Sequence, residues 1–140
     1  MSEVKVKKSI NVSANKAWSK LSAFSGIEEY SPIASSVVEG QGAGAKRVCT
    51  MPYGAKINEV MNSVDDVNMH FQYAITDGPF PITNYVSDVK VRSLDPNNCE
   101  VSWGCSFNSN AEVEGAMKET FEGFYNVIID DLEKVIKEVQ

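Results

Sequence analysis

The side chains that most often carry out enzyme chemistry are scarce in this sequence. His70 is the only histidine, and the three cysteines are Cys49, Cys99 and Cys105. Apolar residues alternate through 67–76 in a phase that places His70 on the polar side of a strand, whereas the cysteines fall on apolar sides. A sheet would then separate His70 from each thiol, so we expect neither a Cys-His nor a Ser-His-Asp arrangement. One histidine and three scattered cysteines also do not match a metal site, and we predict no metal and no cofactor.

The cysteine spacing predicts reduced thiols. Cys99 and Cys105 lie on one predicted strand, about 20 Å apart at 3.3 Å per residue, which is too far for a disulfide. The spacing of Cys49 from either one matches neither a C-x-x-C redox motif nor a zinc ribbon. A reducing compartment fits this pattern best, and we expect a cytoplasmic protein.

Glu59 is the ionisable residue that could act inside the fold. Two alternating sets compete for the inner face of residues 55–64, one of them Ile57, Glu59, Met61 and Ser63, the other Lys56, Asn58, Val60 and Asn62. If Glu59 faces an apolar interior, burial disfavours its charged form. It would then titrate high, pair with Arg47 on the preceding strand, or meet a polar group of a ligand. A structural pair with Arg47 and a functional carboxylate are both open at this stage.

The elements that must position these side chains follow from periodicity. Alternation at the N-terminus predicts a first strand over residues 4–12, and Ser13 is the expected N-cap of a short helix that is followed by a second short turn at 27–30. Turn residues divide the next part of the chain into six predicted strands, at 33–39, 45–52, 55–64, 67–76, 84–94 and 98–107. Such short connections favour antiparallel neighbours.

The C-terminal segment predicts one long amphipathic helix. Residues 111–138 contain no proline and repeat apolar residues at helical spacing. At 1.5 Å per residue such a helix is about 42 Å long, so it must lie along the whole sheet. Ser109 followed by Glu112 predicts a capping box at its start.

Alternation also assigns an inner face to four of the other strands. The expected inward residues are Arg47, Cys49 and Met51; Val67, Met69, Phe71, Tyr73 and Ile75; Tyr85, Ser87, Val89 and Val91; and Cys99, Val101, Trp103, Cys105 and Phe107.

Length and charge limit the class of protein. A chain of 140 residues is the usual size of one domain, and we expect a single domain over 1–140. The net charge of -6 opposes binding to nucleic acid. No segment is apolar for long enough to predict a signal peptide or a membrane span. We therefore expect a monomer with no nucleic-acid partner and no stable membrane insertion.

Four segments together resemble the START/Bet v 1-like (SRPBCC) helix-grip superfamily. They are Ile-Asn-Val-Ser-Ala-Asn-Lys-Ala-Trp at 10–18, Gly-Ala-Gly-Ala-Lys-Arg at 42–47, the strand that contains Glu59, and Trp-x-x-x-Phe at 103–107. Within the superfamily the pattern is similar to the polyketide cyclase/dehydrase and lipid-transport branch. The resemblance covers nearly the whole chain. It implies an α+β helix-grip fold, in which a curved seven-stranded antiparallel sheet wraps around the long C-terminal helix and two short helices follow the first strand.

The resemblance also implies an internal cavity between the sheet and the C-terminal helix, and it favours the inward orientation of Glu59. The expected ligand is a small hydrophobic molecule of the lipid, polyketide or aromatic type, oriented by a few polar groups. The predicted ligand-binding residues are Cys49, Met51, Glu59, Met61, Phe71, Tyr73, Tyr85, Ser87, Trp103, Met117, Phe121 and Tyr125. In an antiparallel meander the turns at 52–55, 77–83 and 108–110 fall at one end, and the first two are the candidate entrance loops.

Three functions fit these features. The favoured hypothesis is a non-enzymatic protein that binds, sequesters or transports the ligand. The alternative is a polyketide cyclase/dehydrase-like enzyme in which Glu59 is the general acid or base and a tyrosine hydroxyl polarises a carbonyl. In the third, the fold is a scaffold for protein interactions and the cavity is vestigial.

Overall fold

The structure is a computed structural model that describes residues 1–138, and its elements follow the predicted order. They are β1 (Ser2–Ile10), α1 (Ala14–Ser22), the 3-10 turn η1 (Ile27–Glu29), β2 (Ser35–Glu39), β3 (Lys46–Thr50), β4 (Lys56–Asp65), β5 (His70–Asp77), β6 (Thr83–Asp95), β7 (Asn98–Asn108) and α2 (Ala111–Glu138). Among these residues neither α-helix is long and apolar enough to cross a membrane.

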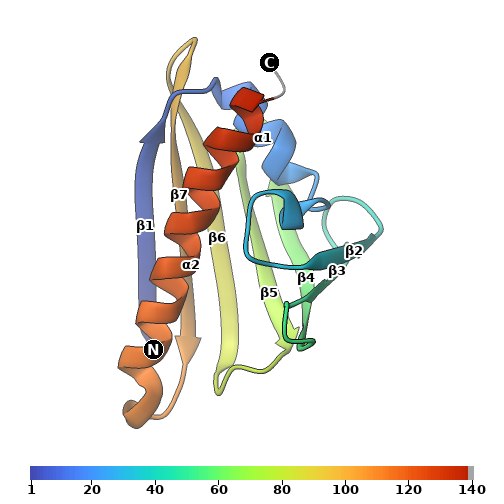
Figure 1. Cartoon of the computed structure of the whole chain (residues 1–140), viewed down its shortest axis with the longest axis vertical. Coiled ribbons are helices and arrows are strands. Elements are labelled where there is room, and N and C mark those ends of the chain that lie inside the picture. The colour runs from blue at the N-terminus through green and yellow to red at the C-terminus, as the bar shows by residue number, and fades with distance from the viewer. Residues whose placement is uncertain (139–140) are drawn as a thin grey trace.

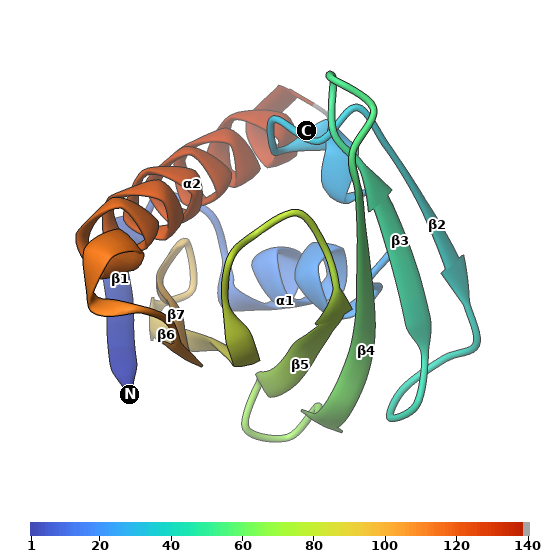
Figure 2. The ribbon, with the colours of Figure 1, turned by 90° about the horizontal axis from the view of Figure 1, so that it is seen from below.

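One antiparallel sheet holds all seven strands, in the order β1-β7-β6-β5-β4-β3-β2. The sheet is open, because β1 and β2 form its two edges. Figure 1 shows α2 running along the inner face of the sheet, and Figure 2 shows from below how the strands curl around α1 and α2. The predicted helix-grip architecture is therefore confirmed, and it leaves the inner residues of each strand facing the helices.

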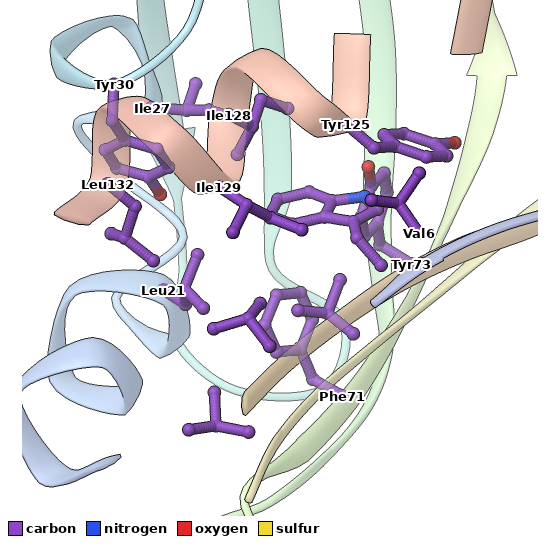
Figure 3. Packing of buried hydrophobic residues seen from close by; sticks show 14 of the residues in the cluster. Val6, Leu21, Ile27, Tyr30, Phe71, Tyr73, Tyr125, Ile128, Ile129 and Leu132 are labelled. Carbon is purple, nitrogen blue, oxygen red and sulfur yellow. The ribbon is translucent and has the colours of Figure 1, made fainter. Parts of the chain in front are cut away.

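The core forms between the inner face of the sheet and the apolar side of α2. Ile128, Ile129 and Leu132 of α2 are fully buried, and Figure 3 shows them pointing at side chains of the sheet and of α1. Ion pairing ties α2 to the edge strand as well, since Lys8 Nζ of β1 lies 2.7 Å from Asp130 Oδ1. Both side chains of this pair are partly exposed, so the buried apolar contacts account for most of the attachment of α2 to the sheet.

A β-bulge in β4 corrects one predicted orientation. Met61 pairs with Tyr73, but the next paired residue is Ser63, opposite Gln72, so one residue of β4 is inserted between them. An inserted residue reverses the phase of the alternation. Ser63 was predicted to face inward and is exposed, whereas Val64 packs against the core.

The turn before β5 corrects a second orientation. The predicted strand 67–76 begins only at His70, because residues 66–69 form the turn. Asp65 holds this turn by accepting a hydrogen bond from the backbone N–H of Asn68 at 3.1 Å. Val67 was predicted to face inward and is 91% exposed at the tip of the turn.

The two predicted helix caps have different outcomes. Ser13 is confirmed as the N-cap of α1, since its hydroxyl accepts a hydrogen bond from the Lys16 N–H at 3.2 Å. The capping box at α2 is wrong, because the Ser109 hydroxyl donates to the carbonyl oxygen of Asn110 instead. The first turn of α2 is held from β1, where the Ser2 hydroxyl donates to the Glu114 carboxylate.

Candidate functional site

The predicted ligand-binding residues come together on the inner side of the sheet. All of them are buried except Met51, which is half-buried at the end of β3. Their elements explain the convergence: β3, β4, β5, β6 and β7 are consecutive neighbours in the sheet, and Met117, Phe121 and Tyr125 are on the buried side of α2.

Arg47 and Glu59 form a buried ion pair at the β3–β4 side of the interior. They are opposite each other in the strand register, and Arg47 Nε donates to Glu59 Oε1 at 2.6 Å. The Cys49 thiol lies 3.4 Å from the same oxygen. Of the alternatives that the sequence left open, the structure contains the pair with Arg47. Burial alone would lower the pKa of Arg47, but the charge of Glu59, with smaller effects of Cys49 and Tyr73, raises that pKa above its ordinary value.

The rest of the Arg47 guanidinium faces aromatic rings. Its Cζ lies 3.8 Å from the ring centroid of Phe24 and 5.2 Å from that of Tyr73. Nη1 donates to the Phe24 carbonyl oxygen at 2.9 Å, whereas Nη2 is buried with no hydrogen-bond partner. Cation–π attraction to the two rings stabilises the Arg47 guanidinium at this position. One of its nitrogens, Nη2, nevertheless lacks a hydrogen-bond acceptor.

Buried tyrosines extend the row of polar groups that begins at the Arg47–Glu59 pair, from Tyr73 of β5 to Tyr125 of α2. The hydroxyl groups of Tyr85 and Tyr125 are hydrogen-bonded to each other across the interior. Ser87 is fully buried next to them on β6 and donates to the Gly104 carbonyl oxygen at 2.8 Å. Burial is the main cause that raises the pKa of Tyr73 to about 12, and it also raises the pKa of Tyr85 and of Tyr125. These phenols are neutral hydrogen-bonding groups at neutral pH.

Trp103 contributes a second unsatisfied donor. Its ring stacks on Tyr125 with centroids 5.8 Å apart and meets Tyr73 edge-on at 6.4 Å. The residue is 1% exposed, and its Nε1–H has no hydrogen-bond partner. The other tryptophan, Trp18, donates its Nε1–H to Asp66 Oδ1 at 2.9 Å.

Side chains fill the centre of the fold around these groups. Trp103 and Tyr125 are each 1% exposed and Phe107 is 0% exposed. A void wide enough for water would leave accessible area on its lining, so the space around these three rings is closed in this state. Any guest at this position must displace side chains.

Open space lies instead where β5 and β6 separate. The two strands pair only from His70 opposite Lys90 to Ala74 opposite Val86. Beyond that point a pocket of about 520 Å³ opens, lined by residues 74–78, Phe80 and residues 82–86. In Figure 2 the loop between these strands arches from the ends of β5 and β6 toward α2. A second pocket, of about 580 Å³, lies between this loop and residues 108–110, so these two of the three predicted turns do meet at one end.

Phe80 lines this pocket and packs against a buried residue of α2. Its ring packs edge-on against Phe121 with centroids 5.3 Å apart, and Phe121 packs against Tyr85 at 5.2 Å. Sequence reasoning did not include Phe80 among the site residues. The signal was its position between two prolines, Pro79 and Pro81, which stiffen the loop and present the side chain between them.

The outer surface holds the one histidine, as predicted. His70 Nε2 lies 2.5 Å from Asp88 Oδ1 on the outer side of β5 and β6, and Asp88 also accepts from Gln72 at 2.9 Å. None of the buried groups described above contacts it. Within residues 1–138 no three acidic, cysteine or histidine side chains are grouped so as to hold a metal ion.

Comparison with solved structures supports the fold. Similar structures include XoxI from Bacillus cereus (24% identity over 99% of this chain and 98% of that chain, TM-score 0.89) and a protein from Thermobifida fusca (22% identity, 100% and 96%, TM-score 0.87). Another is norcoclaurine synthase from Thalictrum flavum in complex with dopamine and hydroxybenzaldehyde (15% identity, 99% and 88%, TM-score 0.77). At these identities the likeness concerns the fold alone.

Comparison of the sequence identifies the family. No curated protein matches the chain. The family model described as "Polyketide cyclase / dehydrase and lipid transport" matches residues 1–137. This match over nearly the whole length, together with the helix-grip fold, shows that the chain belongs to the polyketide cyclase/dehydrase and lipid transport family.

Proposed function

We propose that this protein binds a small hydrophobic ligand between the sheet and α2, and that it acts by sequestering or transporting that ligand. The observation that carries the proposal is the strip of polar groups buried among aromatic rings, from the Arg47–Glu59 pair through Tyr73 to the Tyr85–Tyr125 hydroxyl pair. Replacing a buried ion pair by well-packed apolar residues of similar volume is often neutral or stabilising, so folding alone does not account for the Arg47–Glu59 pair. Polar groups set in an apolar lining are instead typical of ligand sites.

Ligand entry is proposed at the gap between β5 and β6. Phe80 is half-buried and packs against Phe121, so it can leave its position at less cost than the fully buried rings. The 520 Å³ pocket then becomes continuous with the interior. Norcoclaurine synthase, which holds two small aromatic molecules in a fold of this kind, supports the proposal by analogy.

Native mass spectrometry of the protein purified from its own source tests the proposal. We expect a mass increment that is lost on unfolding, and we expect the uncharged fluorescent probe N-phenyl-1-naphthylamine to bind the ligand-free protein saturably and to be displaced by apolar small molecules. An unloaded protein that also fails to bind this probe in its native state would contradict the proposal and favour a scaffold for protein interactions. We further propose a cytoplasmic location, in keeping with three buried cysteines that form no disulfide.

The enzyme alternative has less support from the geometry. Glu59 Oε1 is already engaged by Arg47 and by the Cys49 thiol, and a proton taken up by the carboxylate would cancel the charge that compensates the buried Arg47. Glu59→Gln separates the two functions once a ligand is known. A carrier should keep its affinity within about 1 to 3 kcal/mol, whereas an enzyme that uses Glu59 as acid or base should lose roughly 10²- to 10⁴-fold in turnover while still binding substrate.

A further inference from the structure

Two buried hydrogen-bond donors in the interior have no acceptor. Among the buried side-chain nitrogen and oxygen atoms of residues 1–138, the unpaired ones are Arg47 Nη2 and Trp103 Nε1. Both side chains are nearly inaccessible, at 2% and 1% exposure. An unpaired buried donor is costly, and native proteins contain few of them. Here both unpaired atoms are donors, so the missing partners are acceptors.

Both donors belong to groups that surround one ring. Tyr73 neighbours both, with its centroid 5.2 Å from the Arg47 guanidinium carbon and 6.4 Å from the Trp103 ring. Phe24, Phe71 and Tyr85 also surround Tyr73, with ring centroids 6.0 Å, 6.2 Å and 6.2 Å away. A flat molecule that enters beside Tyr73 therefore meets aromatic rings and comes close to the side chains that carry both donors.

The charge at this position restricts the acceptor. Arg47 carries one positive charge and Glu59 one negative charge, and Nε of the first donates to Oε1 of the second at 2.6 Å. The interior is therefore already neutral before a ligand enters. A carboxylate placed at Nη2 would add an uncompensated negative charge to this buried space, next to Glu59. A ketone, ester, amide or phenol oxygen accepts the same hydrogen bond and adds no charge.

We infer that the ligand is an uncharged aromatic or conjugated molecule with oxygen acceptors that meet Arg47 Nη2 and Trp103 Nε1, and that Glu59 excludes carboxylates by neutralising Arg47. This inference rests on the proposed function and makes it narrower. Of the lipid, polyketide and aromatic classes, it selects carbonyl-bearing conjugated molecules and excludes free fatty acids.

The two tryptophans allow a direct test in the unmodified protein. With ¹⁵N-labelled protein, the indole N–H signals of Trp18 and Trp103 are followed by NMR as 6-methoxy-2-acetonaphthone is added. We expect the Trp103 proton to move downfield as it gains an acceptor, while Trp18, already bonded to Asp66 at 2.9 Å, stays in place. Trp103→Phe assigns the two signals. If the ketone binds and the Trp103 proton does not move downfield, the inference is overturned.

Matched ligands and variants test the selectivity. The ligands share a naphthalene ring and carry a ketone (the same 6-methoxy-2-acetonaphthone), a carboxylate (6-methoxy-2-naphthoate) or no carbonyl (2-ethyl-6-methoxynaphthalene). We expect Trp103→Phe to weaken the ketone about 3- to 10-fold and to leave the carbonyl-free compound within about two-fold, since one hydrogen bond is lost. Equal effects of Trp103→Phe on the two compounds would overturn the inference.

Glu59→Gln provides a gain of binding. Removing the compensating charge leaves Arg47 as an unbalanced cation, so the carboxylate should bind this variant at least about ten-fold more tightly than it binds the wild type. Circular dichroism and thermal unfolding establish whether the variant is folded. If the variant does not fold, the NMR experiment on the wild-type tryptophans tests the inference instead. A folded variant that still rejects the carboxylate overturns the role of Glu59. The proposed function is contradicted separately, by a wild-type protein that carries no guest and binds neither N-phenyl-1-naphthylamine nor any of the three naphthalenes.

Discussion

Charge balance at Arg47 explains why a buried cation is tolerated in this core. Glu59 compensates the charge of the guanidinium, whose Nη1 donates to the Phe24 carbonyl oxygen and whose Cζ lies 3.8 Å from the Phe24 ring centroid. Removing one partner of such a pair typically costs about 3 to 5 kcal/mol, because the other charge is left buried and unpaired. The pair is therefore part of the fold as well as of the proposed site.

The three thiols should be inert toward thiol reagents in the native state. Burial is the main cause that raises the pKa of Cys49 to about 12 and the pKa of Cys99 and of Cys105 to about 11. The thiolate is the reactive form, and at pH 8 a shift from 9 to about 12 lowers its fraction at Cys49 roughly a thousand-fold. With Ellman's reagent at pH 8 we expect no rapid reaction of the native protein and three equivalents after unfolding. One fast thiol in the native protein would contradict this assignment.

Two glycines differ in the space around them: Gly104 lies at a close contact between strands, and Gly123 lies on the open surface of a helix. A Cβ at Gly104 of β7 would lie 2.7 Å from the Val4 carbonyl oxygen of β1, too close for either strand to keep its position. At Gly123, on α2, a Cβ would meet no atom within 4 Å. We expect Gly104→Ala to lower the free energy of unfolding by about 1 to 3 kcal/mol. The matched Gly123→Ala should raise it by about 0.5 to 1 kcal/mol, because alanine is the better helix former.

Urea unfolding followed by circular dichroism measures both glycine variants. Equal effects of the two substitutions would show that β7 and β1 do not approach as closely as described. The same comparison tests the register between these strands, since Gly104 lies opposite Lys5.

The loop between β5 and β6 should control the rate of ligand exchange. Phe80 packs on Phe121 at 5.3 Å and lines the pockets on both sides of the loop. Phe80→Ala should speed both association and dissociation of the uncharged probe N-phenyl-1-naphthylamine, measured by stopped-flow fluorescence, with little loss of stability because the side chain is only half-buried. Tyr53→Ala is the control, since Tyr53 is 70% exposed in the other candidate entrance loop. If the exchange rate is unchanged in the Phe80 variant, or changes equally in both variants, the ligand does not enter between β5 and β6.

Periodicity predicted the elements well because each carries a complete local signal. The alternation in β7 and the apolar stripe of α2 give both the element and its buried face, and all five predicted inward residues of β7 are buried. Ser63 and Val67 were misassigned for local reasons that alternation does not encode, namely an inserted residue in β4 and a turn capped by Asp65. Sequence pattern also does not predict the conformation of the loop between β5 and β6. Phe80 was therefore missed, although the prolines on both sides of it could be read from the sequence.

At the scale of the whole molecule, the interior contains an ion pair, three thiols and several phenol groups in addition to apolar side chains. The ion pair was foreseen as one alternative, because Arg47 and Glu59 occupy neighbouring strands with matching phase. The unpaired atoms of Arg47 and Trp103 could not be predicted from the sequence. They depend on how these side chains pack against rings from β5, α2 and the segment after α1. Sequence pattern places residues on a face, and three-dimensional packing decides which of their atoms are left without a partner.

These buried acids make stability sensitive to alkaline pH. In the unfolded chain thiols lose their protons near pH 9 and phenols near pH 10, whereas in the folded protein the pKa is about 11 for Cys99 and Cys105 and about 12 for Cys49 and Tyr73. Between these values the unfolded state binds fewer protons, so the free energy of unfolding must fall as pH rises. The stabilisation is complete below pH 9. The loss is at most about 1.4 kcal/mol per pH unit for each group.

Urea unfolding at pH 8, 9 and 10 measures this loss. From pH 8 to pH 10 we expect the free energy of unfolding to fall by roughly 4 kcal/mol, about 1.3 kcal/mol of it from each of the three cysteines, whose ordinary pKa is lower than that of the phenols. A variant with all three cysteines changed to alanine is the control: it should be less stable at pH 8, because buried volume is lost, but its stability should change much less between pH 8 and pH 10. The difference in slope isolates the thiols from any general effect of alkali. A wild-type stability that stays constant to pH 10 would mean that the thiols are accessible to solvent and that the interior is more open than the packing around Cys49 and Cys105 implies.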